Sequence, residues 1–141
     1  MTKSPEQSTP DTLPASARPL SPHLGYYRTF TQITSLTSIM HRMTGSALVF
    51  GSLIVVTWLL ALSHGEEPYT RFLSYLTMPL GKLVMMGLSW AFWYHFINGL
   101  RHLTWDTGHG LKRETARLSG KIIIAASFIV TALMWLYIGG L

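Results

Sequence analysis

The chain has 141 residues, no cysteine and a formal net charge of +5 at pH 7, and only 12% of its residues are charged. A soluble domain usually carries about 25% charged residues, so this composition indicates a membrane protein with a single domain. The absence of cysteine excludes disulfides, thiolate zinc sites and cysteine-ligated iron–sulfur clusters within the chain. Any redox chemistry here therefore needs a bound organic or haem cofactor.

The first element in chain order is a polar tail, residues 1–28, which holds five of the seven prolines. It has no apolar core of the signal-peptide type. Its acidic residues, Glu6 and Asp11, and its few arginines argue against a transit peptide. We expect an extended N-terminal tail and surface segment, followed by a transmembrane domain over residues 29–141.

Three stretches without a charged side chain follow: Met43–Gly65 with 23 residues, Leu83–Leu100 with 18 and Ile122–Leu141 with 20. About 20 apolar residues cross a bilayer as one helix. The sequence therefore predicts an all-α membrane protein with three transmembrane helices. The predicted spans are residues 43–65, 74–101 and 119–140.

The basic residues indicate how the chain is oriented. Four precede the first span and five lie between the second and third, whereas the loop between the first and second has Glu66, Glu67 and only Arg71. Basic loops stay on the cytoplasmic side of a membrane. We therefore expect the N-terminus inside and the C-terminus outside. Because this pattern accounts for the positive charge, we expect no nucleic-acid partner.

His95 lies inside the second predicted span, six residues before Arg101, which we place at the inner interface. A rise of about 1.5 Å per residue puts it roughly 9 Å into the hydrocarbon, where a polar ring needs a partner. Asn98 and Gly99 follow on nearly the same face. The amide can form a hydrogen bond, and the glycine leaves a slot for a flat group. His102, two turns after His95, returns to this face beside Arg101.

A haem fits this layout, because histidine is a usual axial ligand and Arg101 and His102 could hold the two propionates. The alternative is that His95 only forms a hydrogen bond with a neighbouring helix. No other histidine of the chain lies at that depth. A low-spin haem would take its second ligand from another polypeptide, and otherwise the haem would be five-coordinate. We expect the first arrangement, a haem shared with a partner.

Ser38 and Arg42 are four residues apart at the start of the first predicted helix, and therefore share a face, with His41 beside them. A hydroxyl and a guanidinium together suit a carbonyl oxygen that gains negative charge on reduction. A membrane quinone has such oxygens. The alternative is that Ser38 caps the helix and Arg42 binds lipid headgroups, and this segment alone favours the alternative.

Three motifs together resemble the cytochrome b subunits of succinate dehydrogenase, the large membrane anchors of respiratory complex II. They are RPLSPHL (18–24), SIMHRMTG (38–45) and HFINGLRHLTWDTG (95–108). The resemblance covers about residues 18–141. It implies a subunit of succinate:ubiquinone oxidoreductase in the respiratory chain and the tricarboxylic acid cycle. Succinate would be oxidised on separate flavoprotein and iron–sulfur subunits, and this chain would perform no succinate chemistry itself.

The resemblance also implies roles for single residues. His95 corresponds to an axial ligand of haem b, whose other ligand is a histidine of a second small anchor subunit in the same helical bundle. Ser38 and Arg42 correspond to residues that line the ubiquinone site, completed by the second anchor and the iron–sulfur subunit. The residues expected around the haem propionates, or as their hydrogen-bonding neighbours, are His41, Asn98, Arg101 and His102.

The chain departs from the family pattern at Gly25 and Tyr26, in the segment before the first helix. The alternatives to the main hypothesis are a fumarate reductase anchor and a haem-free structural anchor. A small transporter is disfavoured, because only His95 and Asn98 offer a polar path and both lie near one side. We expect the chain in the inner (plasma) membrane of a bacterium, or in the mitochondrial inner membrane of a eukaryote.

Overall fold

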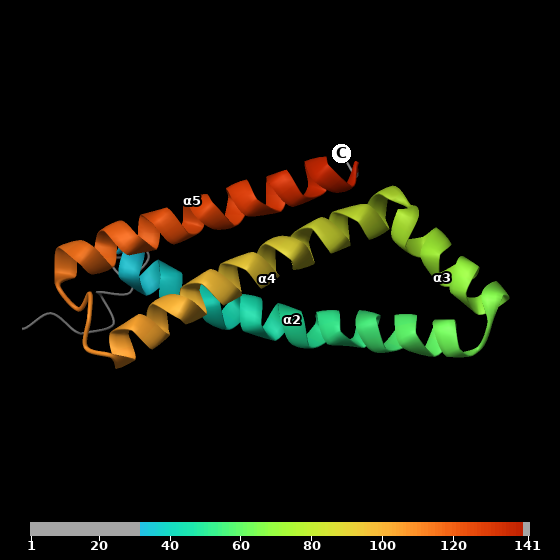
Figure 1. Ribbon diagram of the computed structural model, residues 1–141, viewed down its shortest axis with the longest axis horizontal. Helices are drawn as coiled ribbons and strands as arrows, with labels where there is room; N and C mark the ends of the chain where they lie inside the picture. Colours follow the sequence, from blue (N-terminus) through green and yellow to red (C-terminus); the bar gives the residue numbers. More distant parts are fainter. Residues whose placement is uncertain (1–31, 140–141) are drawn as a thin grey trace, which may run out of the picture.

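The computed structural model describes residues 32–139, which form four helices joined by short turns (Figure 1). The helices are α2 (Ile33–Ser63), α3 (Glu66–Thr77), α4 (Pro79–Asp106) and α5 (Arg113–Ile138). The prediction of an all-α chain is confirmed for this part of the protein. The predicted tail, residues 1–28, and the motif at residues 18–24 lie outside the described residues.

The three long helices α2, α4 and α5 run along the length of the molecule, and α3 joins α2 to α4 at one end (Figure 1). α4 and α5 lie side by side. The first turns of α2 pack against both, since Thr37 contacts Arg101 of α4 and lies close to Gly120 of α5. α2 and α4 then diverge towards α3 (Figure 1). The three helices therefore meet at the end of the bundle opposite α3.

α2 begins at Ile33, ten residues before the first predicted span. The predicted span began later because it included only the uncharged stretch. The first turns of α2 are polar, and the threonine hydroxyl groups there are satisfied by carbonyls of the same helix. Thr37 donates to the carbonyl of Thr34 at 3.0 Å, and Thr44 donates to that of Met40 at 2.8 Å. Such bonds are how Ser and Thr side chains are accommodated inside helices.

A sharp bend separates α3 from α4. Residue Met78 between them is extended, with φ −62° and ψ 154°, and Pro79 occupies the first turn of α4. Proline disfavours the helical conformation in the preceding residue and is well suited to a helix start, which explains the break. The two helix axes differ by 80°. The second predicted span, residues 74–101, therefore crosses this bend and is not one straight helix.

The interior of the bundle is small or polar, and its surface is apolar. Among residues 32–139 the buried hydrophobic side chains are Ala91, Tyr94, Ala116 and Ile123, whereas large apolar residues are exposed along all three long helices. The buried polar residues are Thr37, Thr44, Asn98, Arg101, Ser127 and Thr131. Such a pattern is typical of helices that pack through small and polar residues in a lipid environment.

Two helices in the described region, α2 and α5, are each long and apolar enough to cross a membrane. A third span is obtained only if the bent pair α3 and α4 is counted as one. The prediction of a membrane protein is thus supported, with two or three spans. The predicted count of three and the predicted orientation stay predictions.

Candidate functional site

Three histidines from two helices lie together at the place where α2 crosses α4. The rings of His41 and His95 are stacked, with centroids 3.9 Å apart and planes at 8°. His102, two turns along α4 from His95, lies 5.2 Å from the His41 ring. The structure therefore brings together three of the residues predicted around a haem. We call His41, His95 and His102 the histidine cluster.

The ring of His95 is held by its Nδ1 atom. This nitrogen lies 3.1 Å from the backbone carbonyl oxygen of His41 and 3.4 Å from the hydroxyl of Thr44. A carbonyl oxygen can only accept a hydrogen bond, so Nδ1 carries the proton and donates it. The unprotonated Nε2 is then the nitrogen with a lone pair for a metal. Hydrogen bonding through the other ring nitrogen is the usual way that a ligand histidine is oriented.

Gly45 leaves room for the edge of the His95 ring. A Cβ atom at residue 45 would lie 3.0 Å from Cε1 of His95 and 4.0 Å from Nε2. The first distance is shorter than ordinary carbon–carbon contact. The same Cβ would lie 3.5 Å from Nδ1, so any larger residue would crowd the Cε1–Nδ1 side of the imidazole and displace the ring. Among residues 32–139 the hydrogen bonds of His95 use Nδ1 alone, which leaves Nε2 without a partner, so His95 fits an axial ligand.

His41 has an unused polar atom next to this ring. Its Nδ1 is buried and has no hydrogen-bond partner among residues 32–139. Buried polar atoms in native proteins are nearly always paired, so an orphan of this kind calls for an explanation. A hydrogen-bonding group of a bound molecule beside His95 would supply the missing partner.

Ser38 and Arg42 lie in a shallow surface hollow on the first turns of α2. Both side chains are exposed. The hollow has a volume of about 360 Å³ and is lined by Thr34, Ser35, Ser38, Ile39 and Arg42. The structure thus places the two predicted quinone residues together, on a part of α2 adjacent to the histidine cluster. Hydroxyl groups and one guanidinium make this hollow suited to an acceptor oxygen.

Asn98 and Arg101 form a second group of contacts, the Arg101 cluster, next to the histidine cluster. Arg101 is 7% exposed and donates to the hydroxyl of Thr37 at 3.2 Å and to the carbonyl of Ala116 at 2.6 Å. It also lies 3.4 Å from the Asn98 amide oxygen, and its guanidinium stands 4.1 Å from the ring centre of Trp105. These contacts join α2, α4 and α5. Arg101 is thus engaged within the chain, and Trp105 connects it to the histidine cluster, since the Trp105 and His102 ring centroids are 5.2 Å apart.

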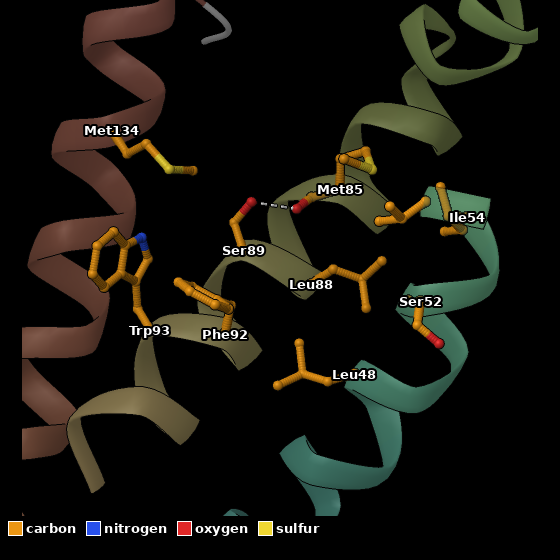
Figure 2. Close-up of a pocket in the computed structure, with 11 residues that line it drawn as sticks. Leu48, Ser52, Ile54, Met85, Leu88, Ser89, Phe92, Trp93 and Met134 are labelled. Carbon is orange, nitrogen blue, oxygen red and sulfur yellow. Dashed lines mark hydrogen bonds between the residues drawn. The ribbon is translucent and has the colours of Figure 1, made fainter. Parts of the chain in front are cut away.

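An apolar cleft lies between α2 and α4, with Met134 of α5 also in its lining (Figure 2). Its volume is about 370 Å³. The only hydroxyl groups at its wall come from Ser52 and Ser89, which bond to carbonyl groups of their own helices. The cleft can therefore hold apolar matter such as a hydrocarbon chain or the edge of a flat ring. Its lining residues are Leu48, Gly51, Ser52, Ile54, Val55, Met85, Leu88, Ser89, Phe92, Trp93 and Met134.

Three residues of the site were missed by the sequence interpretation. Thr44 and Gly45 stand in the motif SIMHRMTG, and their place one turn after His41 was the available signal. Tyr94, whose hydroxyl bonds to α2, directly precedes His95 and gives no signal of its own, because aromatic residues fill this stretch of α4.

Comparison with known proteins gives a consistent result. Residues 14–134 match the family described as succinate dehydrogenase/fumarate reductase transmembrane subunit. The chain is 39% identical over 118 residues to the succinate dehydrogenase cytochrome b556 subunit of Rickettsia felis, covering 84% of this chain and 90% of that one. It is 40% identical over 116 residues to the subunit of the same name from Paracoccus denitrificans, covering 82% and 88%. A mouse mitochondrial cytochrome b560 subunit is 34% identical over 119 residues, covering 82% and 68%.

Proposed function

The chain belongs to the family of succinate dehydrogenase/fumarate reductase transmembrane subunits, and we propose that it is the cytochrome b anchor of a succinate dehydrogenase, where it binds haem b and forms part of the ubiquinone-reduction site. The observation that carries the proposal is the geometry of His95. Its Nδ1 is bound to the His41 carbonyl at 3.1 Å, which leaves the lone pair of Nε2 for a metal, and Gly45 makes room for the ring.

In this proposal Nε2 of His95 is one axial ligand of the haem. The other ligand comes from a histidine of a second small anchor subunit. The bound haem would supply a centre that stores one electron at a time. His41 and His102 stand beside His95, and His41 has an unpaired buried nitrogen, so these two residues are proposed near the propionates. Asn98 and Arg101 were predicted there as well. The bonds of Arg101 to Thr37 and Ala116 favour a different role for it, whereas Nδ2 of Asn98 is buried without a partner among residues 32–139.

Ubiquinone is proposed to place one carbonyl oxygen at Ser38 and Arg42. The Ser38 hydroxyl would donate a hydrogen bond, and the guanidinium of Arg42 would stabilise negative charge on the oxygen during reduction. Both groups are exposed, as a substrate from the lipid phase requires. Two electrons would come from the soluble subunits, which oxidise succinate, and two protons complete the quinol.

The partners of the chain follow from this assignment. They are the second anchor, which completes the haem and quinone sites, an iron–sulfur subunit and a flavoprotein subunit. The apolar surface of α2, α4 and α5 suits lipid and a second helical subunit equally well. The membrane is proposed to be the bacterial inner membrane, crossed three times, with the start of α2 and the α4–α5 loop inside.

An anchor of a fumarate reductase, which would run the reaction in reverse, is the alternative within the same family. The names of the relatives from Rickettsia felis and Paracoccus denitrificans favour succinate dehydrogenase. A haem-free anchor is the other alternative, and the orientation of His95 argues against it.

The proposal is tested on the complex purified from its native membrane. We expect a reduced-minus-oxidised spectrum with a low-spin b-type haem, lost or broadened in His95→Ala. Arg42→Gln should lower the succinate-driven reduction of quinone, whereas succinate oxidation with a soluble dye acceptor stays unchanged. An assembled wild-type complex without haem would leave only the haem-free anchor. Unchanged quinone kinetics in Arg42→Gln would remove that residue from the quinone site.

A further inference from the structure

Building on the proposed function, we infer that Tyr94 and Arg101 are positioning residues, which hold the first turns of α2, and with them the quinone residues, in a fixed place relative to His95. Neither residue is proposed to touch haem or quinone. They act through Thr37, which both of them contact.

Tyr94 forms one half of this connection. Its hydroxyl donates to the backbone carbonyl of Thr37 at 2.9 Å. The two side chains are 0% and 1% exposed, so no lipid or water competes for the bond. A hydrogen bond inside an apolar environment is electrostatically stronger than one in water. Because Tyr94 directly precedes His95, the bond lies one residue from the proposed haem ligand.

Arg101 forms the other half and connects all three long helices. One guanidinium nitrogen donates to the hydroxyl of Thr37 in α2 at 3.2 Å, and the other donates to the carbonyl of Ala116 in α5 at 2.6 Å. Trp105 stacks on the guanidinium at 4.1 Å. The described residues give Arg101 no carboxylate partner, so its charge is stabilised by these oxygens and by the indole ring. A buried charge held in this way is costly to displace.

The direction of Thr37 determines where its neighbours on α2 point. Successive residues of a helix are about 100° apart, so an inward Thr37 turns Ser38 and, one turn on, Arg42 towards the outer hollow. The residue one turn after Thr37 is His41, which stacks on His95 at 3.9 Å. Slipping α2 by one residue would turn it by about 100° and shift it by about 1.5 Å. Both the stacking and the position of the hollow would then be lost.

The test uses Tyr94→Phe, which removes only the hydroxyl, in the complete complex. Tyr137→Phe is the matched control, because Tyr137 is 92% exposed. The readouts are the haem-to-flavin ratio, the haem midpoint potential, and KM and kcat for the quinone. We expect Tyr94→Phe to keep its haem, shift the potential and raise the KM about fivefold, as for one lost neutral hydrogen bond, with a smaller change in kcat. Tyr137→Phe should change none of these.

Thr37→Val is the second variant, since replacing Arg101 could prevent assembly altogether. Valine keeps the shape of threonine but cannot accept the Arg101 hydrogen bond. We expect a shift of the potential and a rise of KM in the same direction as with Tyr94→Phe. Thr57→Val, at an exposed position of α2 whose hydroxyl bonds only to its own helix, is the control.

An unchanged potential and an unchanged KM in both Tyr94→Phe and Thr37→Val would overturn the inference. The proposed function would survive that result, because the wild-type complex would still show its haem and reduce quinone. A wild-type complex without haem or quinone reduction would instead overturn the proposed function, and the inference with it.

Discussion

The clearest prediction concerns Gly45→Ala, which adds a single methyl group against the proposed haem ligand. The new Cβ would lie 3.0 Å from Cε1 of His95. The imidazole has little freedom to move away, because its Nδ1 is bound to the His41 carbonyl at 3.1 Å and its face is stacked on the His41 ring. We therefore expect His95 to shift, and its Nε2 to leave its position for the iron.

The size of the effect follows from two opposing contributions. Alanine in place of glycine inside a helix stabilises it by about 1 kcal/mol. A methyl group forced into a packed site costs about 1–3 kcal/mol. At Gly45 the cost exceeds the gain, since relief requires the loss of a hydrogen bond as well. Gly51→Ala is the matched control, because its Cβ would lie 3.1 Å from Cδ2 of Leu88, a flexible side chain that can rotate away.

The assay is the haem-to-flavin ratio of the purified complex together with its reduced optical spectrum. We expect Gly45→Ala to lose haem or to show a broadened, shifted band, whereas Gly51→Ala resembles the wild type. Equal spectra and equal haem content in both variants would refute the reasoning. The added Cβ is similarly close to a neighbouring side chain in the two variants, and that side chain is His95 in one and Leu88 in the other.

Three further predictions concern other parts of the bundle. Gly120→Ala should lower the yield of assembled complex and reduce its free energy of unfolding by about 1–3 kcal/mol, because the added Cβ would approach Ile33 of α2 to 2.8 Å. Gly87→Ala is the control, since its Cβ would have nothing within 4 Å, and equal yields of the two variants would contradict the prediction. Ser38→Ala should raise the KM for quinone about fivefold and leave the haem spectrum unchanged; a lost haem band would place Ser38 elsewhere. Glu67→Gln breaks an exposed ion pair with Arg71 and should change the free energy of unfolding, measured by thermal denaturation, by under about 1 kcal/mol. A larger loss of stability would show that α3 depends on this pair.

The helices and their apolar surface could be predicted from the sequence, because long uncharged stretches leave few other structures in a membrane protein. The proximity of Ser38 and Arg42 also followed from their spacing within one helix. The bend before Pro79 was missed, although proline marks it, because the predicted span was extended from the uncharged stretch at Leu83 back to residue 74. Hydropathy identifies the residues that suit a membrane, but it does not identify the residues at which a helix bends.

The grouping of Asn98 with His95 illustrates why the rest could not be predicted. A spacing of three residues turns a helix by about 300°, so Asn98 lies about 60° to one side of His95. In the structure that side faces α5 and the Arg101 cluster, where Asn98 is 0% exposed, and the other side faces His41. Whether Asn98 joins His95 or the Arg101 cluster depends on where α2 and α5 lie around α4. Spacing within one helix contains no such information.

Helix α3, whose axis lies at 80° to that of α4, is a suitable place to attach a label to the complex. None of its 12 residues is buried, and it stands at the opposite end of the bundle from the Arg101 cluster (Figure 1). A fluorophore or an affinity tag attached along it would leave both the histidine cluster and the hollow at Ser38 and Arg42 undisturbed. Its accessibility to reagents that cannot cross the membrane would also report which side of the bilayer α3 faces, and so fix the direction in which the whole chain is threaded.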